Sequence, residues 1–175
     1  MIREYPKQPL VGVGGVVIHG DRVLLIKRGT EPLKDQWSIP GGLLELGENL
    51  ADGARRELQE ETGLDVEPLE VIAVFDRILR DTDELGRWSL EGGGRVRYHY
   101  VIVDYLCRLK GGKLAPASDV LDARWVARDD LAGYSLTELA TSVIVQAFAR
   151  WIERKEPTDD VDSGDLGNAV GAPTA

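Results

Sequence analysis

The chain is poor in the side chains that form disulfides and soft-metal sites. It has one Cys and two His among 175 residues. A single Cys excludes an internal disulfide and any Cys-based zinc cluster. Cys107 ends the apolar run VIVDYLC at residues 101–107, and no activating pattern surrounds it. We therefore expect a small buried side chain rather than a reactive thiol, and a reducing, cytoplasmic compartment.

Long hydrophobic runs are also missing. The longest apolar runs fall well short of the roughly 18 residues that a membrane span requires, and the N-terminus lacks the apolar core of a signal peptide. We therefore predict no membrane association. The net charge of −9 and the pI near 4.8 argue against binding to a nucleic acid polymer or to anionic lipid. A phosphate-bearing ligand would need a cation as mediator.

The acidic residues are concentrated at the C-terminus. Residues 156–175 contain five Asp and Glu and no Lys or Arg, and they are rich in Gly, Pro and Ala without apolar periodicity. This composition is typical of a disordered acidic tail. The remaining residues 1–155 have the length of one domain.

Apolar, β-branched and aromatic runs predict strands. They cover residues 11–18, 23–26, 37–39, 66–79, 96–109 and 123–127. Residues 29–47 are expected to be mostly loop, and residues 80–95 form a polar, glycine-rich insertion that is compatible with a lid, a dimer arm or a mobile hairpin. A homodimer is therefore an open alternative.

Two helices are predicted. The first begins after Asn49 as N-cap and stops at Gly63, and the second begins with a capping box from Ser135 to Glu138 and ends near Arg154. Strands and two separated helices in this order predict an α/β fold, an α/β/α sandwich with a mixed β-sheet between helices.

The first helix carries a spaced set of glycine, acidic and basic residues. Its pattern is G-x5-E-x7-R-E-U-x-E-E-x-G-U, where U is aliphatic, and the fixed positions are Gly42, Glu48, Arg56, Glu57, Glu60, Glu61 and Gly63. At about 6% for each residue type, seven fixed positions match by chance in about three of 10⁹ windows. Coincidence is negligible.

The helical period places Glu57, Glu60 and Glu61 along the border of the apolar stripe and leaves Arg56 on the solvent side. Carboxylates three or four positions apart are about 5–6 Å from each other and repel, by roughly 3 kcal/mol at an effective dielectric constant of about 20. A cation between them would relieve this repulsion. Oxygen ligands without His or Cys suit Mg²⁺ or Mn²⁺, so we predict these three glutamates as metal ligands. The alternative is a solvated helix with ordinary surface ion pairs.

Residues 42–64 match the Nudix box throughout, and the order of strands and helices over residues 8–154 resembles a Nudix domain. The resemblance implies a pyrophosphohydrolase that uses metal ions to cleave a nucleoside diphosphate linked to another moiety. It also implies a metal-ligand role for Glu57, Glu60 and Glu61, joined by the carbonyl of Gly41. By the same resemblance, Glu48 and Arg56 orient the catalytic helix and its loop.

The general base is left open between Glu61, Glu60 and an acid from a downstream loop, for which Asp119 is the candidate. Asp119 has a capping or turn role as its alternative. Gly42 lets the backbone approach a phosphate. Arg28 and Lys34 precede the box and are candidates for phosphate contacts, with surface roles as the alternative.

The aromatic residues near the insertion have two readings. Trp88, Tyr98 and Tyr100 are candidates for stacking on a nucleobase, but hairpin core is the simpler role. His19 and His99 lie in predicted strands and are expected to be structural.

Segments outside the box bear on the substrate. RYHYVIVDYLCR at residues 97–108 and SDVLDARWV at residues 118–126 are similar to an ADP-ribose pyrophosphatase-like branch. This favours ADP-ribose or a related nucleotide sugar as the small-molecule substrate. The alternatives are a house-cleaning hydrolase of nucleoside triphosphates or modified dNTPs and, from another class, a nucleotide-sensing domain that binds without turnover.

Overall fold

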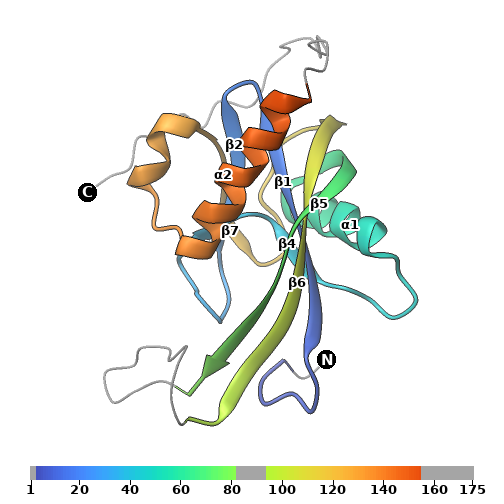
Figure 1. Ribbon diagram of the computed structural model, residues 1–175, viewed down its shortest axis with the longest axis vertical. Helices are drawn as coiled ribbons and strands as arrows, with labels where there is room; N and C mark the ends of the chain where they lie inside the picture. The colour runs from blue at the N-terminus through green and yellow to red at the C-terminus, as the bar shows by residue number, and fades with distance from the viewer. Residues whose placement is uncertain (1–2, 82–93, 155–175) are drawn as a thin grey trace.

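The computed structural model describes residues 3–81 and 94–154 (Figure 1). Trp88, most of the 80–95 insertion and the predicted tail at 156–175 lie outside the described residues. The strands are β1 (Leu10–His19), β2 (Arg22–Arg28), β3 (Trp37–Ser38), β4 (Gly41–Leu43), β5 (Leu64–Arg80), β6 (Val96–Gly112) and β7 (Val120–Ala127). The helices are α1 (Leu50–Thr62), the short 3₁₀ helix η1 (Arg128–Gly133) and α2 (Glu138–Glu153).

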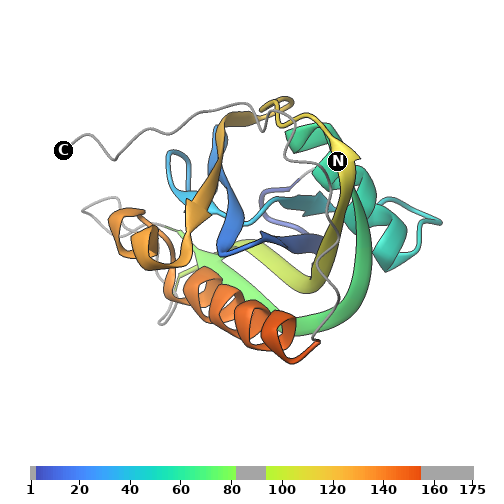
Figure 2. The same cartoon turned by 90° about the horizontal axis from the view of Figure 1, so that it is seen from above.

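The strands form one mixed sheet. Its main order is β3-β2-β1-β6-β5, with β4 paired to β1 and β7 paired to β2. The β1–β6 pair is parallel and the other pairs are antiparallel. Helices α1 and α2 lie on opposite sides of the central strands (Figure 2). The predicted α/β fold with a mixed sheet between helices is confirmed.

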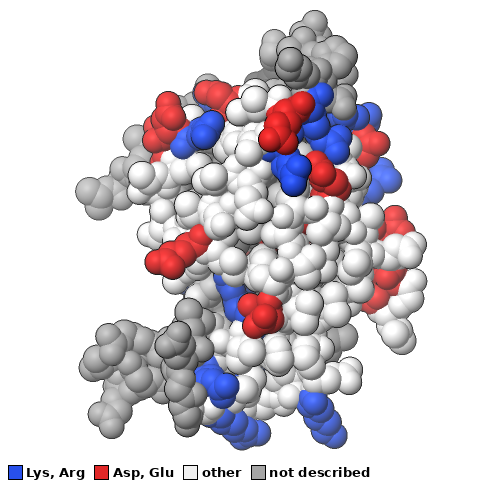
Figure 3. Space-filling model, viewed as in Figure 1, with Lys and Arg blue, Asp and Glu red and all other residues white. Residues whose placement is uncertain are grey.

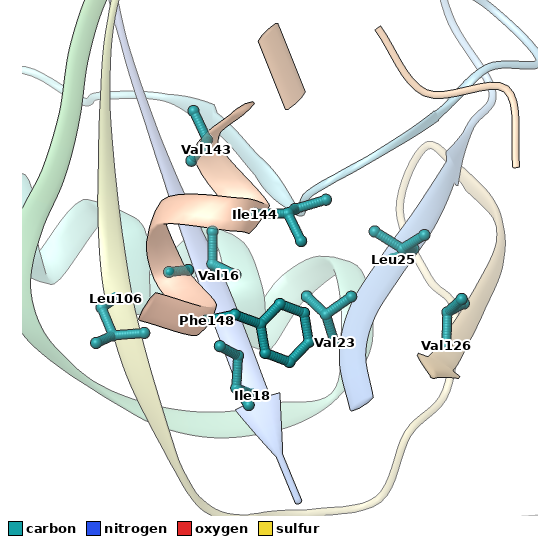
Figure 4. Close-up of a cluster of buried hydrophobic side chains, with 10 residues drawn as sticks. Val16, Ile18, Val23, Leu25, Leu106, Val126, Val143, Ile144 and Phe148 are labelled. Carbon is teal, nitrogen blue, oxygen red and sulfur yellow. The ribbon is translucent and has the colours of Figure 1, made fainter. Parts of the chain in front are cut away.

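Residues of β1 pack into two hydrophobic clusters, one on each face of the sheet. Successive residues of a strand point to opposite faces, so Val16 and Ile18 face one way and Val17 the other. Val16 and Ile18 pack in a buried cluster with Phe148 and other residues of α2 (Figure 4). Val17 packs with Leu58 of α1 in a second cluster. The continuous apolar run of β1 therefore belongs to a strand that is covered on both faces.

The ends of α1 agree with the sequence prediction. Asn49 has the extended backbone of an N-cap, and Gly63 closes the helix with a left-handed φ of 72°. The Asn49 side chain accepts no capping hydrogen bond, and instead its amide donates to Asp52 over 3.1 Å.

The predicted start of α2 was wrong by two residues. The N-cap is Thr137, whose Oγ1 accepts a hydrogen bond from the Ala140 amide over 3.2 Å. Ser135 cannot serve as the cap because its segment is used for pairing: the Ser135 carbonyl accepts from the Trp37 amide, and Leu136 forms an isolated bridge with Trp37.

Strand lengths also differ from the prediction. β5 and β6 contain 17 residues each, and β7 begins three residues before the predicted start at 123. β4 lies in the segment 29–47 that was expected to be mostly loop, and it pairs with Gly12, Val13 and Gly14 of β1. Glycine is depleted in strands, so only pairing with β1 makes Gly41–Leu43 a strand.

The described residues also bear on the expectations for membrane spans, the single cysteine and the surface charge. No helix of the described residues is long and apolar enough to cross a membrane. Cys107 is fully buried, as expected, and burial raises the pKa of its thiol to about 12. Acidic and basic side chains are interspersed over the upper part of the face in Figure 3, and basic ones gather at its lower end.

Candidate active site

An open cavity of about 1160 Å³ borders one edge of α1. It extends over β4 and the loop that follows, and reaches the segments after β2 and before β7. Among the residues predicted from sequence, its lining includes Gly42, Arg56, Glu57, Glu60, Glu61 and Asp119. The structure therefore brings the acidic edge of α1 and the downstream acid Asp119 to one hollow, although they are far apart in the sequence.

Glu61 is the most deeply placed of these acids. Its residue is 5% exposed, and its Oε2 accepts a hydrogen bond from the Gly41 amide over 2.8 Å. Burial raises the pKa of Glu61 to about 8, and the charges of Asp119 and Glu57 add to the effect. A proton or a bound cation is thus needed to stabilise this carboxyl at neutral pH.

We expect the stability of the metal-free protein to depend on this pKa. The folded-state pKa of Glu61 lies above its ordinary value of 4.5, so its contribution is fully present below about pH 4.5 and is lost as the pH rises through about 8. Glu61→Gln does not titrate. In chelator, its melting temperature relative to wild type should therefore rise from pH 5 to pH 9 in thermal denaturation. A constant difference across this range would contradict the assignment.

The carboxylate of Glu57 packs closely against the backbone of Gly42. The Glu57 side chain is 14% exposed, and a Cβ at Gly42 would overlap its carboxylate. Burial raises the pKa of Glu57, while the hydrogen bond from Arg56 acts against this. Gly42 therefore has a second function besides backbone freedom, because it makes room for an acidic side chain of the next helix.

Arg56 connects the helix to the preceding loop. Its Nε donates to Glu48 Oε1 over 2.9 Å and its Nη2 to Glu48 Oε2 over 3.1 Å, which is a bidentate ion pair. Nη2 also donates to the Leu43 carbonyl, and Nη1 donates to Glu57 over 2.8 Å and to Glu60 over 3.4 Å. The Arg56 pair holds the pKa of Glu48 below its usual range.

The expectation that Arg56 faces solvent was wrong. Its side chain is only 23% exposed. The helical period treats α1 as an isolated cylinder, whereas in the fold Glu48 and the loop beside it cover this side of the helix. The same guanidinium contacts Glu57 and Glu60, so it supplies part of the positive charge that we expected between the acids.

The oxygen atoms that line the cavity suit a hard cation, although the acidic side chains are not close enough together to form a complete metal site. Within residues 3–81 and 94–154, no three His, Cys, Asp or Glu side chains form a ready metal cluster. Glu60 has a half-exposed side chain, while Glu57 and Glu61 are buried further in. The described lining of the cavity offers carboxylate and carbonyl oxygen and no His or Cys. This chemistry fits Mg²⁺ or Mn²⁺ rather than a soft metal.

The other predicted residues are distributed around the site. Asp119 Oδ2 accepts from Thr30 Oγ1 over 2.7 Å at the cavity wall. Arg28 donates from Nε to the Pro32 carbonyl over 3.0 Å, and its charge opposes, without reversing, the effect of burial that raises the pKa of Glu61. Lys34 is exposed and lines neither of the two cavities described here.

The strand aromatics and histidines have mainly structural surroundings. Tyr98 is 2% exposed and donates from its hydroxyl to Glu4 over 2.7 Å, and its ring stacks on Tyr100. The His19 ring packs near Trp125 with centroids 5.8 Å apart. His99 lies within β6.

A second, smaller cavity of about 120 Å³ adjoins the first and shares Arg3, Gly42 and Leu43 with it. Arg28 and Tyr100 line it, together with Arg77 and Asp104, which the sequence reasoning missed. A signal for Asp104 was present, because it is the one charged residue in the apolar run VIVDYLC. Thr30 was also missed, since nothing in its local sequence connects it to Asp119.

The NUDIX domain family matches residues 8–148 of the chain. The chain belongs to this family. One relative is the ADP-ribose pyrophosphatase of Methanocaldococcus jannaschii, 27% identical over 82% of this chain and 75% of that protein. Another is a MutT-like protein of Streptomyces ambofaciens, 30% identical over 74% of this chain and 73% of that protein.

The architecture of this Nudix protein also recurs in solved structures. The MutT NUDIX hydrolase of Burkholderia pseudomallei superposes with a TM-score of 0.63 at 28% identity, over 80% of this chain and 98% of that one. Family, relatives and fold agree with the resemblance seen in the box. The protein is a Nudix pyrophosphohydrolase, an enzyme class that hydrolyses diphosphate linkages in small-molecule nucleotides.

Proposed function

We propose that this Nudix enzyme hydrolyses the diphosphate linkage of ADP-ribose or a related nucleotide sugar, and that it requires Mg²⁺ or Mn²⁺. The observation that carries the proposal is the buried Glu61 carboxyl, which is bonded to Gly41 and borders the same cavity as Glu57, Glu60 and Asp119. The substrate class is supported by the relative named ADP-ribose pyrophosphatase, which matches most of this chain.

The residues that would hold the metal are Glu57, Glu60 and Glu61, with the carbonyl of Gly41. When bound, a divalent cation neutralises charge on the diphosphate oxygens and lowers the pKa of water. The cavity contributes an oxygen-rich wall, and Gly42 presents no side chain that would obstruct the diphosphate. Arg28, which lines the smaller adjoining cavity, is the candidate for a phosphate contact from that side, whereas the exposed Lys34 is a peripheral candidate.

A carboxylate of the site takes the proton of the attacking water. Glu61 and Glu60 both line the cavity, and Glu60 is the more accessible of the two. Asp119 faces the same cavity from the opposite segment, and Thr30 orients its carboxylate. Glu48 and Arg56 act as positioning residues, because their ion pair connects the loop after β4 to α1.

Removing the metal should abolish activity. The acids of the cavity cannot by themselves offset the negative charge of a diphosphate, so we expect no turnover in excess chelator and recovery on addition of Mg²⁺ or Mn²⁺. The measurement is initial rate against free metal concentration, with Ca²⁺ as a comparison. Full turnover in chelator would contradict the mechanism.

A substrate panel tests the specificity. We expect the enzyme to release AMP and ribose 5-phosphate from ADP-ribose, with a higher kcat/KM than for any nucleoside triphosphate. The second candidate is a hydrolase of nucleoside triphosphates or modified dNTPs, which the MutT-like relative favours. Release of pyrophosphate from these substrates as the dominant activity would replace the first proposal with the second. Binding without any turnover would instead indicate a sensing domain.

A further inference from the structure

Asp104 is a buried carboxyl for which the described residues supply no hydrogen-bond donor. It lies in β6, is 2% exposed and lines the smaller cavity. Within residues 3–81 and 94–154 its carboxylate has no hydrogen bond or ion pair, and its oxygens are open to the cavity rather than fully enclosed. A carboxylate in such a site is stabilised when a ligand or solvent supplies hydrogen-bond donors.

The sheet places Asp104 close to the catalytic edge. In the ladder, Asp104 pairs with Gly14 of β1, and Gly14 pairs with Gly41 of β4. Gly41 in turn donates to Glu61. Neighbouring strands are about 4.8 Å apart, so the backbones of Asp104 and Gly41 are about 10 Å apart. A Cβ at Gly14 would overlap the Asp104 carboxylate, so the glycine makes room for it.

The walls of the smaller cavity combine this acceptor with cations and apolar side chains. Arg77 and Arg28 line the cavity with Asp104, and Phe75 and Ile102 supply apolar surface. Arg77 is half-buried, and its guanidinium donates a hydrogen bond to Thr137 Oγ1 over 3.4 Å. Its charge lowers the pKa of Asp104, against the larger effect of burial, which raises it. The arginines match phosphate oxygens, and Asp104 matches hydroxyl donors.

We propose that Asp104 accepts hydrogen bonds from the 2′- and 3′-hydroxyls of the nucleoside ribose and thereby selects ribonucleotides over 2′-deoxyribonucleotides. The inference rests on the proposed function, in which the diphosphate lies in the larger cavity. The ribose is the group bonded directly to the diphosphate, so it is the part that reaches across Gly41 and Gly42. A carboxylate only accepts, and two vicinal hydroxyls offer it two donors.

The test is an equilibrium titration that needs no turnover. The probes are α,β-methylene-ADP and its 2′-deoxy form, whose P–C–P linkage is not hydrolysed, with Mg²⁺ in calorimetry. In the wild type we expect the ribo form to bind about tenfold more tightly, the effect of a hydrogen bond to a charged group. In Asp104→Ala the ratio of the two dissociation constants should approach one. Asp76→Ala, an exposed acid of β5 outside both cavities, is the matched control and should keep the wild-type ratio.

Equal affinity of the wild type for both probes would overturn the inference without any variant. A ratio in Asp104→Ala that equals the wild-type ratio would also overturn it. If Asp104→Ala does not give a cooperative thermal transition, the nearly isosteric Asp104→Asn takes its place and should reduce the ratio. Failure of the proposed function is a separate outcome, which would be seen as a lack of ADP-ribose turnover. The two outcomes can be distinguished because the ratio of affinities is measured on analogues that are not cleaved.

Discussion

We expect Glu61→Gln to lower kcat by about 10²- to 10⁴-fold while the protein keeps its fold. This range is typical for loss of a group that handles a proton in the transition state, and loss of a metal ligand acts in the same direction. The Gln side-chain oxygen can still accept the Gly41 amide over the same short distance. The variant also avoids the cost of ionising a buried carboxyl, so its melting temperature should equal or exceed that of the wild type.

The measurement combines steady-state kinetics on the best substrate of the panel with thermal denaturation. The control is Glu153→Gln in α2, an exposed residue that forms a surface pair with Arg150, and this variant should keep wild-type kcat. A Glu61→Gln enzyme with kcat within about twofold of the control would remove Glu61 from the catalytic centre. A variant that has lost its cooperative transition would show instead that Glu61 is needed for folding.

Arg56→Ala has the second large expected effect, on both stability and activity. The substitution leaves Glu48, Glu57 and the Leu43 carbonyl without the guanidinium that pairs with them. Breaking a buried ion pair costs about 3–5 kcal/mol, and the partial exposure of these side chains reduces our expectation to about 2–4 kcal/mol. The melting temperature should fall by roughly 5–15 °C for a domain of this size. Turnover should fall as well, because Glu57 and the loop after β4 lose their fixed positions.

The neighbouring Arg55 provides the matched control. It pairs with Asp65 over 2.7 Å, but both side chains are about half exposed. Such surface pairs contribute less than about 1 kcal/mol, so Arg55→Ala should shift the melting temperature by only a few degrees and leave kcat unchanged. Chemical denaturation of both variants supplies the comparison. Equal losses for Arg55→Ala and Arg56→Ala would mean that Arg56 is only a surface residue.

The local features of α1 could be read from the sequence. Its glycine stop, its apolar stripe and the spacing of Glu57, Glu60 and Glu61 depend on neighbours three or four positions away, which the helical period captures. The start of α2 was misjudged because two equally good cap residues, Ser135 and Thr137, precede it. The bridge between Trp37 and Leu136 makes Thr137 the N-cap, because it holds the segment before Thr137 in an extended conformation. The two bridged residues are about a hundred positions apart in the sequence, so local reasoning does not reveal the contact.

The burial of Arg56 and the identity of β4 show the limit of local reasoning. The sequence placed Arg56 toward solvent, since nothing in a helical projection describes the loop that folds back over it. Gly41–Leu43 has low strand propensity and becomes a strand only beside Gly12–Gly14 of β1. Both outcomes follow from contacts between segments, whose energies exceed the small local preferences of the residues involved.

The sequence by itself determined the family and the acidic edge of α1, because these depend on spacing along one segment. Only the tertiary structure decided that Asp119 faces Glu61 across one cavity and that Asp104 lies two strands from Gly41. These relations are set by strand order and register. Register is chosen by the packing of both faces of the sheet together, and no short stretch of the chain contains that information.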